Sequence, residues 1–183
     1  MATAIDICSN AFIRLGAPPI SSFTAGGAQG TAAGNLYEPT LQAMLSSHRW
    51  RFASAQKTLA RLTATPLNGW SYAFQLPTDL ISLYHAVPNV DYQVYEDKIY
   101  ANVESLDVEY LMRPSETLFP AYFQLALEYQ LASEFALSVT SNRSLAETYE
   151  VKANEQLKKA RFVDSQQSPS VAVQSLAYTD VRS

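Results

Sequence analysis

The chain has 183 residues, enough for one domain with a sizeable hydrophobic core, and its formal net charge is −4. Only 16% of the residues are charged while 11% are aromatic, including eleven tyrosines, a composition that favours surfaces buried against partners. The single cysteine, Cys8, excludes an internal disulfide, and neither an export leader nor a run of about 20 apolar residues is recognised. We therefore expect a soluble protein made in the cytosol.

Two helices are predicted in the first quarter of the chain. The first covers residues 4–15 and has Cys8 on its apolar face as a small core residue. A flexible loop over residues 17–30 follows, because its glycines lack the lysine and the preceding strand of a phosphate-binding loop. The second helix covers residues 31–46, and Pro39 should kink it or split it.

The segment 48–62 contains two large aromatic residues among cations. Trp50 and Phe52 alternate with Arg49 and Arg51, which can stack on aromatic rings or pair with carboxylates. A nucleic-acid-binding surface is one interpretation, but strand periodicity and framing glycines are lacking. We favour a tight turn that inserts both aromatic side chains into the helical core. The residues that follow, 56–62, are predicted to be extended, with alternating character.

A region of β-structure is predicted between the helices. Alternating aromatic residues make 70–74 a strand or an extended arm, and an apolar run then ends at Pro88. Three short strands within residues 92–112, with a turn at Glu96–Asp97, should form a small antiparallel sheet. We therefore expect a β insertion covering about residues 67–113.

The same region holds most of the acidic residues. They occupy turns and alternating strand positions, which predicts a solvated or partner-facing surface: Glu96, Asp97, Glu104, Asp107 and Glu109. Paired carboxylates can also perform general acid–base catalysis when one of them is buried. Since His48 and His85 show no triad or ligand spacing, we expect no catalytic residue, no metal site and no cofactor.

Charge is distributed unevenly along the chain. Residues 1–78 have a balance of +3, residues 79–134 a balance of −8, and residues 135–183 a balance of +1. Such blocks indicate either a nucleic-acid surface or complementary surfaces on neighbouring subunits. The few cations between Arg49 and Arg61 favour the subunit interpretation.

The stretch 120–139 predicts a long helix that is apolar on two sides. One broad face includes Tyr122 and Leu125, and a second stripe has residues spaced four apart: Phe123, Leu127, Leu131 and Phe135. Such a helix can be the central core helix, or one stripe can pack within the subunit while the other meets a neighbouring copy. Both arrangements can hold at once.

A last helix over residues 145–164 and an extended C-terminal segment complete the prediction. The segment 165–183 is expected to be a docking arm that presents alternating apolar side chains to a partner: Val171, Val173, Leu176 and Tyr178. The predicted fold is mainly α, a helical bundle of about four helices with a small antiparallel β insertion. Residues 1–164 form its single domain, and the arm extends from it.

Five stretches, in order, carry a resemblance to a known family. They are AFIRLGAPPISS (Ala11–Ser22), RWRFA (Arg49–Ala53), YAFQLPTDL (Tyr72–Leu80), the helix that starts at Pro120, and the last helix with its spacing of Tyr149, Leu157 and Ala160. Together they resemble the tail tubular protein A family of bacteriophages, the adaptors that join portal to tail. Arg51 departs from this pattern, since a neutral polar residue is commoner there.

The resemblance implies a helical bundle with a small β insertion, assembled as a dodecameric ring in the virion at the head–tail junction. It implies a portal protein and a tail or nozzle protein as partners, and double-stranded DNA that passes through the ring without sequence-specific contact. It implies no catalysis. The alternatives are another phage head-completion or packaging subunit, or a small-molecule enzyme or binding domain that uses the acidic residues.

The charge blocks and the two-sided helix define the residues that we expect at the interface between copies. The candidates are Arg49, Arg51, Phe123, Leu127, Leu131, Asp97, Glu104 and Asp107. We expect Arg49 or Arg51 of one copy to face carboxylates of the next, because opposite charges steer the register of an assembly.

Overall fold

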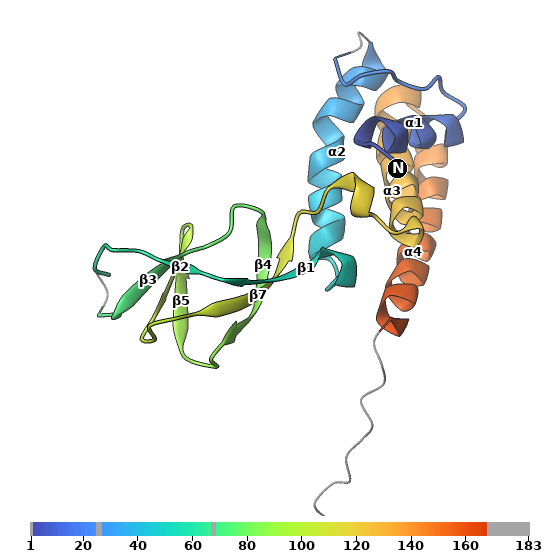
Figure 1. Ribbon diagram of the computed structural model, residues 1–183. Coiled ribbons are helices and arrows are strands. Elements are labelled where there is room, and N and C mark those ends of the chain that lie inside the picture. The colour runs from blue at the N-terminus through green and yellow to red at the C-terminus, as the bar shows by residue number, and fades with distance from the viewer. Residues whose placement is uncertain (1, 25–26, 67–68, 168–183) are drawn as a thin grey trace, which may run out of the picture.

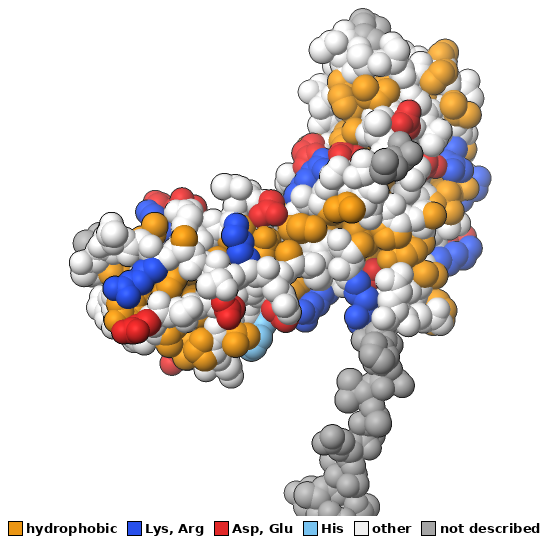
Figure 2. Space-filling model, in the orientation of Figure 1, with side chains coloured by type: hydrophobic (Ala, Val, Ile, Leu, Met, Phe, Trp, Pro, Cys, Tyr) orange, Lys and Arg blue, Asp and Glu red, His pale blue; other side chains and the backbone are white. Residues whose placement is uncertain are grey.

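The computed structural model describes residues 2–24, 27–66 and 69–167. Four α-helices form an upright bundle, and two small sheets project from its side, which gives the molecule an L-shaped outline (Figures 1 and 2). Seven strands are present in the described residues, and all their pairings are antiparallel.

The bundle combines helices from both ends of the chain: α1 (Ala4–Arg14), α2 (Ala28–Ser46), α3 (Ala121–Thr140) and α4 (Arg143–Gln166). The predicted start of α1 is confirmed, because Thr3 and Asp6 form a reciprocal capping box there. α2 runs through Pro39 as one helix, so the predicted split does not occur. α4 is capped by the side chain of Asn142 and continues to Gln166, two residues past the predicted end.

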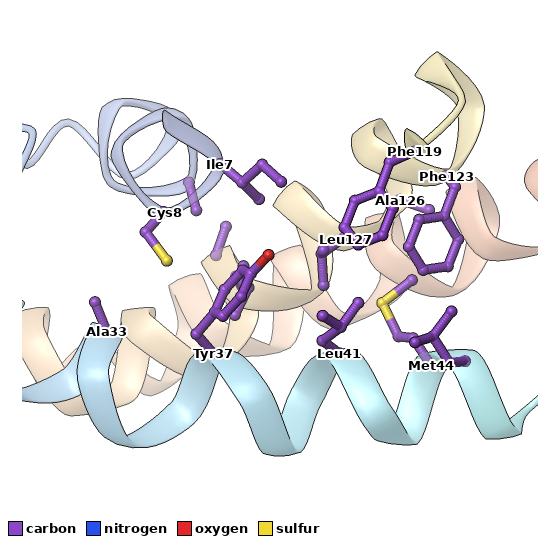
Figure 3. Close-up of a cluster of buried hydrophobic side chains, with 14 of the residues drawn as sticks. Ile7, Cys8, Ala33, Tyr37, Leu41, Met44, Phe119, Phe123, Ala126 and Leu127 are labelled. Carbon is purple, nitrogen blue, oxygen red and sulfur yellow. The ribbon is translucent and has the colours of Figure 1, made fainter. Parts of the chain in front are cut away.

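Helix α3 lies at the centre and contacts the other three helices. In Figure 3, Tyr37, Leu41 and Met44 of α2 point across the core toward Leu127 and Phe123 of α3. Ile7 and Cys8 of α1 are fully buried in the same cluster, which confirms Cys8 as a core residue. Farther along α3, Phe135 stacks on Phe12 with 4.4 Å between the ring centroids.

The turn after α2 inserts aromatic side chains into this core, as predicted. Trp50 is fully buried, and its Nε1–H donates to the backbone oxygen of Met44 at 3.0 Å. Phe52, in the short 3-10 helix η1 (Arg51–Ala53), is half-buried with its ring 4.8 Å from that of Phe123. The turn therefore secures the end of α2 against α3.

The projecting part contains two antiparallel sheets. The three-stranded sheet has the order β1-β7-β4 and consists of β1 (Ser54–Thr58), β4 (Leu80–Val87) and β7 (Asp107–Met112). The four-stranded sheet has the order β2-β3-β6-β5 and consists of β2 (Ala60–Arg61), β3 (Tyr72–Gln75), β5 (Tyr92–Tyr95) and β6 (Lys98–Ala101). Side chains from both sheets form a second hydrophobic core around Phe74, Ile99 and Val108.

The prediction of a mainly α fold is wrong, since the chain has an α+β fold with two sheets. The β region begins at Ser54, before the predicted start of the insertion near residue 67; the extended structure predicted for residues 56–62 is confirmed by β1 and β2. The apolar run 80–87 is also a strand. β1 has the sequence SAQKT and is mostly exposed, so it shows no apolar alternation. It exists because Ser54 to Thr58 pair with β7, more than 45 residues later in the sequence.

The sheets are fastened to the bundle at Arg113, directly after β7. One nitrogen of its guanidinium, Nη2, lies 2.8 Å from a carboxylate oxygen of Glu38 on α2 and 2.7 Å from one of Glu116. Glu116 also accepts from the hydroxyl of Tyr37 at 3.2 Å. Together with Leu111 of β7, which is buried in the helical core, this cluster fixes the sheets against α2.

Candidate subunit interface

Arg49 is engaged within its own chain. Its Nη2 lies 2.9 Å from a carboxylate oxygen of Glu109 on β7, and its guanidinium lies 4.6 Å from the ring centroid of Tyr84 on β4. Hydrogen bonds from Gln56 and from Arg49 lower the pKa of Glu109. We predicted that Arg49 or Arg51 would face a carboxylate of a neighbouring copy. For Arg49, the carboxylate with which it pairs belongs to the same subunit.

Arg51 has an exposed side chain. Its backbone N–H donates to the carboxylate of Asp164, at 3.2 Å and 3.3 Å to the two oxygens. The side chain lines a shallow hollow of about 370 Å³ together with Arg49 and Ser54. Arg51 therefore stays available to a partner.

The expectation that Phe123, Leu127 and Leu131 meet a neighbouring copy requires a correction. All three are fully buried within the subunit. α1, α2 and α4 all pack on α3, so this stripe is covered within the same chain, while Leu125 on the broad face remains 37% exposed. Apolar periodicity predicts which positions of a helix are buried, but it does not predict which element, in the same chain or in a neighbouring copy, buries them.

The predicted acidic residues are on the surface. Asp97 is in the turn after β5, where it accepts from the side-chain amide of Gln75 at 2.9 Å and its pKa is lowered by that hydrogen bond. Asp107 accepts from the Thr58 hydroxyl at 2.6 Å, and Glu104 is exposed in the turn before β7. The other predicted docking residues, Val171, Val173, Leu176 and Tyr178, lie outside the described residues.

A buried carboxylate that the sequence analysis did not single out lies in the helical bundle. Glu128 of α3 is only 4% exposed, and its carboxylate lies 2.6 Å from Nη2 of Arg14 at the end of α1. The amides of Asn10 and Gln124 donate to its other oxygen at 2.9 Å and 3.1 Å. A charged residue within an apolar helical stretch is the signal that could have identified it.

Asp164 of α4 is the second buried carboxylate, with 1% exposure. It accepts from the Tyr122 hydroxyl at 2.8 Å, and His48 Nε2 lies 3.4 Å from its other oxygen. Burial and the hydrogen bond to Asp164 raise the pKa of Tyr122 to about 12. This cluster, together with the backbone of Arg51, ties the end of α4 to the turn after α2.

Apolar side chains also remain exposed on the described surface. On the outer side of α4, Phe162 is 64% and Val151 is 60% exposed, and Leu137 of α3 is 60% exposed. The edge strand β5 is exposed at all four positions, including its tyrosines and Val94. Apolar side chains that are exposed at neighbouring positions of one element, such as Phe162 and Val163 of α4 or Val94 and Tyr95 of β5, are candidates for burial against a partner, whereas scattered ones are common on any protein.

The described residues contain no group of three or more His, Cys, Asp or Glu side chains placed to hold a metal ion. Within the same ranges, no helix combines the length and the apolar character needed to cross a membrane. No protein-family model matches the chain, and no curated protein is significantly similar to it.

Proposed function

We propose that the chain is a structural subunit of a bacteriophage particle, a head-to-tail adaptor that forms a ring between portal and tail. Double-stranded DNA passes through this ring without sequence-specific contact. The portal protein and a tail or nozzle protein are its partners, and its place is the head–tail junction of the virion. The ordered resemblance of the five sequence stretches supports this function.

The exposed apolar side chains are the structural observation that carries the proposal. Phe162 and Val151 are eleven residues apart, which is three turns of helix, so they lie on one side of α4. Burying apolar surface stabilises association by about 25 cal/mol per Å² before the costs of ordering are subtracted. In a symmetric oligomer, the same contact between neighbouring copies buries these surfaces on every subunit.

The mass of the purified protein tests the proposal. A single chain has a mass of 20.2 kDa, and a dodecamer would have a mass of about 240 kDa. Light scattering after size-exclusion chromatography should give a mass of many subunits, and negative-stain images should show rings with a central opening. The same measurements on protein mixed with portal-containing heads cover the case in which the portal nucleates the ring. A chain that stays single in both settings would contradict the proposal.

A further inference from the structure

Strand β5 forms an open edge of the four-stranded sheet. All four of its residues are exposed, and Tyr92, Val94 and Tyr95 are between 37% and 46% exposed. An open edge with apolar side chains and no internal charge is a template for another strand. β5 therefore lacks the internal charges and prolines that often prevent edge pairing, while its length of four residues limits the pairing to a short contact.

Hydrogen-bond alternation shows which backbone groups β5 offers. Tyr95 pairs with Lys98 across a two-residue turn whose first residue, Glu96, has φ of 54°, and such turns join their flanking residues by hydrogen bonds. The N–H of Leu76 donates to the Asp97 oxygen at 2.9 Å. Asp97 therefore directs its backbone groups toward β3, and the next residue, Lys98, directs its own toward β5, which agrees with the pairing of Tyr95 and Lys98. It follows that Tyr92 and Val94 direct their N–H and C=O groups to the open edge.

Strand β1 forms an open edge of the other sheet. The N–H of Leu59 donates to the Leu106 oxygen at 2.9 Å, and β1 pairs with β7 in the register Gln56 to Glu109. By the same alternation, Gln56 and Thr58 direct their N–H and C=O groups away from β7, as does the C=O of Ser54, whose N–H already donates to the Arg51 oxygen at the end of η1. Each edge thus presents alternate residues for pairing.

The two edges have opposite charges. Asp91 and Glu96 flank β5, whereas Lys57 lies within β1 and Arg51 precedes it. None of these four side chains takes part in the ion pairs found within the described residues. A lysine in an edge strand hinders indiscriminate pairing, but it accommodates a strand that brings an acid opposite it.

We propose that β5 of one copy adds antiparallel to the β1 edge of the next copy, with Gln56 opposite Tyr92 and Lys57 opposite Asp91. This inference rests on the proposed function, because it names the contact that joins neighbouring subunits of the ring. The register aligns the outward backbone groups of both strands and brings Arg51, just before β1, to the turn at Glu96–Asp97 that follows β5. A shift by two residues would put Lys57 opposite Gln93 and lose the charge match.

Charge also selects this pairing over the symmetric alternative. Two β5 strands pairing with each other would bring Asp91 of one copy beside Glu96 of the other, and like charges at neighbouring positions are unfavourable. A contact between two different edges is heterologous, so it repeats head to tail and closes into a ring when the rotation permits.

Val94→Pro and Val94→Thr form a matched pair of variants for a first test. Proline removes the outward N–H of an edge strand, which the sheet tolerates, while threonine keeps both the N–H and the branched shape. We expect Val94→Pro to raise the concentration of half-assembly about tenfold or more, which is about 1.4 kcal/mol per contact, and Val94→Thr to change it far less. Circular dichroism and Tm establish that both variants fold. A folded Val94→Pro variant that assembles like the parent would overturn the inference.

Charge reversal on both edges provides the second test. Asp91→Lys with Glu96→Lys, or Arg51→Glu with Lys57→Glu, should each weaken assembly about tenfold at low salt, since two favourable pairs become repulsive. An equimolar mixture of the two reversed proteins still contains opposite edges and should form hetero-oligomers. The protein with all four substitutions should regain assembly. Absence of rescue in both cases would rule out this pairing.

A disulfide trap reports the register directly. Ala55 and Gln93 would face each other as a non-hydrogen-bonded pair, the close pairing that suits a disulfide. The variant with both Ala55→Cys and Gln93→Cys should form covalent ladders under oxidation, whereas either single variant should not. The native Cys8 is buried and its thiol pKa is raised to about 12, so it supplies little background. Rings without ladders, and without an effect of Val94→Pro, would refute this contact while leaving the proposed function in place; the absence of any assembly would refute both.

Discussion

At the scale of single residues, Glu128 and Arg14 show how the helical bundle holds a charge in its interior. Glu128 is enclosed by α1 and α3, whereas the side chain of Arg14 is 29% exposed and can reach water. The two partners are therefore unequal, because only the carboxylate depends on the protein for its stabilisation. The same asymmetry applies to Asp164, which is buried beside the partly exposed His48.

The first prediction compares Arg14→Leu with Glu128→Gln. Arg14→Leu leaves a buried carboxylate with only neutral donors, and we expect it to lower the free energy of unfolding by about 3 kcal/mol. Glu128→Gln should cost about 1 kcal/mol, because a neutral amide is easier to bury and Arg14 can turn to solvent. Urea denaturation of both variants gives the comparison, and equal losses would contradict the proposed asymmetry.

The second prediction concerns acid and the cluster around Arg113. The hydrogen bond from Arg113 lowers the pKa of Glu38. For Glu116, burial raises the pKa, but the hydrogen bonds and the charge of Arg113, a backbone hydrogen bond and the Tyr37 hydroxyl together outweigh burial, so its pKa is also lowered. The stability from these two shifts is fully present above the unfolded pKa, about 4.3, and is lost as pH falls through the lower folded values.

Glu38→Gln should therefore reduce the urea midpoint at pH 7, and the difference from the parent should shrink between about pH 4.5 and pH 3. The measurement is a series of urea unfolding curves across this range. A difference that stays constant to pH 3 would show that the ionised carboxylate of Glu38 makes no contribution.

At the scale of elements, α2 contains a proline whose tendency to break the helix is overcome by the packing of its neighbours. Pro39 lies in the exposed side of the helix and removes one backbone hydrogen bond, yet the helix continues to Ser46. Tyr37, Leu41, Met44 and Leu45 are buried on both sides of this position, and their burial outweighs the local penalty.

The third prediction follows from this balance. Pro39→Ala restores the N–H and removes the clash with the preceding turn, while it also increases the conformational freedom of the unfolded chain. We expect a net gain of about 1 kcal/mol and a rise in Tm of about 2–4 °C. Differential scanning calorimetry, with the exposed Thr31→Ala substitution in the same helix as a control, provides the measurement. A fall in Tm would show that proline fits this site without strain.

At the scale of the whole molecule, the described part encloses its own cores. The helical core and the sheet core are both formed by residues between Ile7 and Ala160. The predicted docking arm covers residues 165–183, but α4 continues to Gln166 and the segment 168–183 lies outside the described residues. Under the proposed function this segment docks on the portal or on an adjacent adaptor.

The fourth prediction is that deletion of residues 168–183 leaves the fold intact and abolishes attachment to portal-containing heads. Tm should stay within about 2 °C of the parent, because the described residues between Ile7 and Ala160 already form both cores. Co-sedimentation with heads measures attachment. A truncated protein that still attaches would assign the docking surface to the folded part of the chain.

Sequence by itself determined the elements whose signals are local. Apolar periodicity located all four helices to within a few residues, and the turn at Glu96–Asp97 located the hairpin of β5 and β6. The cap at Thr3 is confirmed, whereas the last helix is capped by Asn142 and not by the capping box of Ser144 and Glu147 that the sequence suggests. The same local signals identified Trp50 as a core residue and the acids near β5 as surface groups.

Tertiary structure alone decided which partners these elements find. The sequence predicts extended structure over residues 56–62 but not its partner, and it is the pairing of β1 with β7 that creates the second sheet. The second stripe of α3 would be apolar whether its own subunit or a neighbouring copy covered it. The structure shows that helices of the same subunit cover it, so it belongs to the internal core. Arg14 meets Glu128 across 114 positions because helix packing brings them together. Pairing, packing and burial join residues that are distant in the sequence, whereas capping, turns and periodicity depend on adjacent ones.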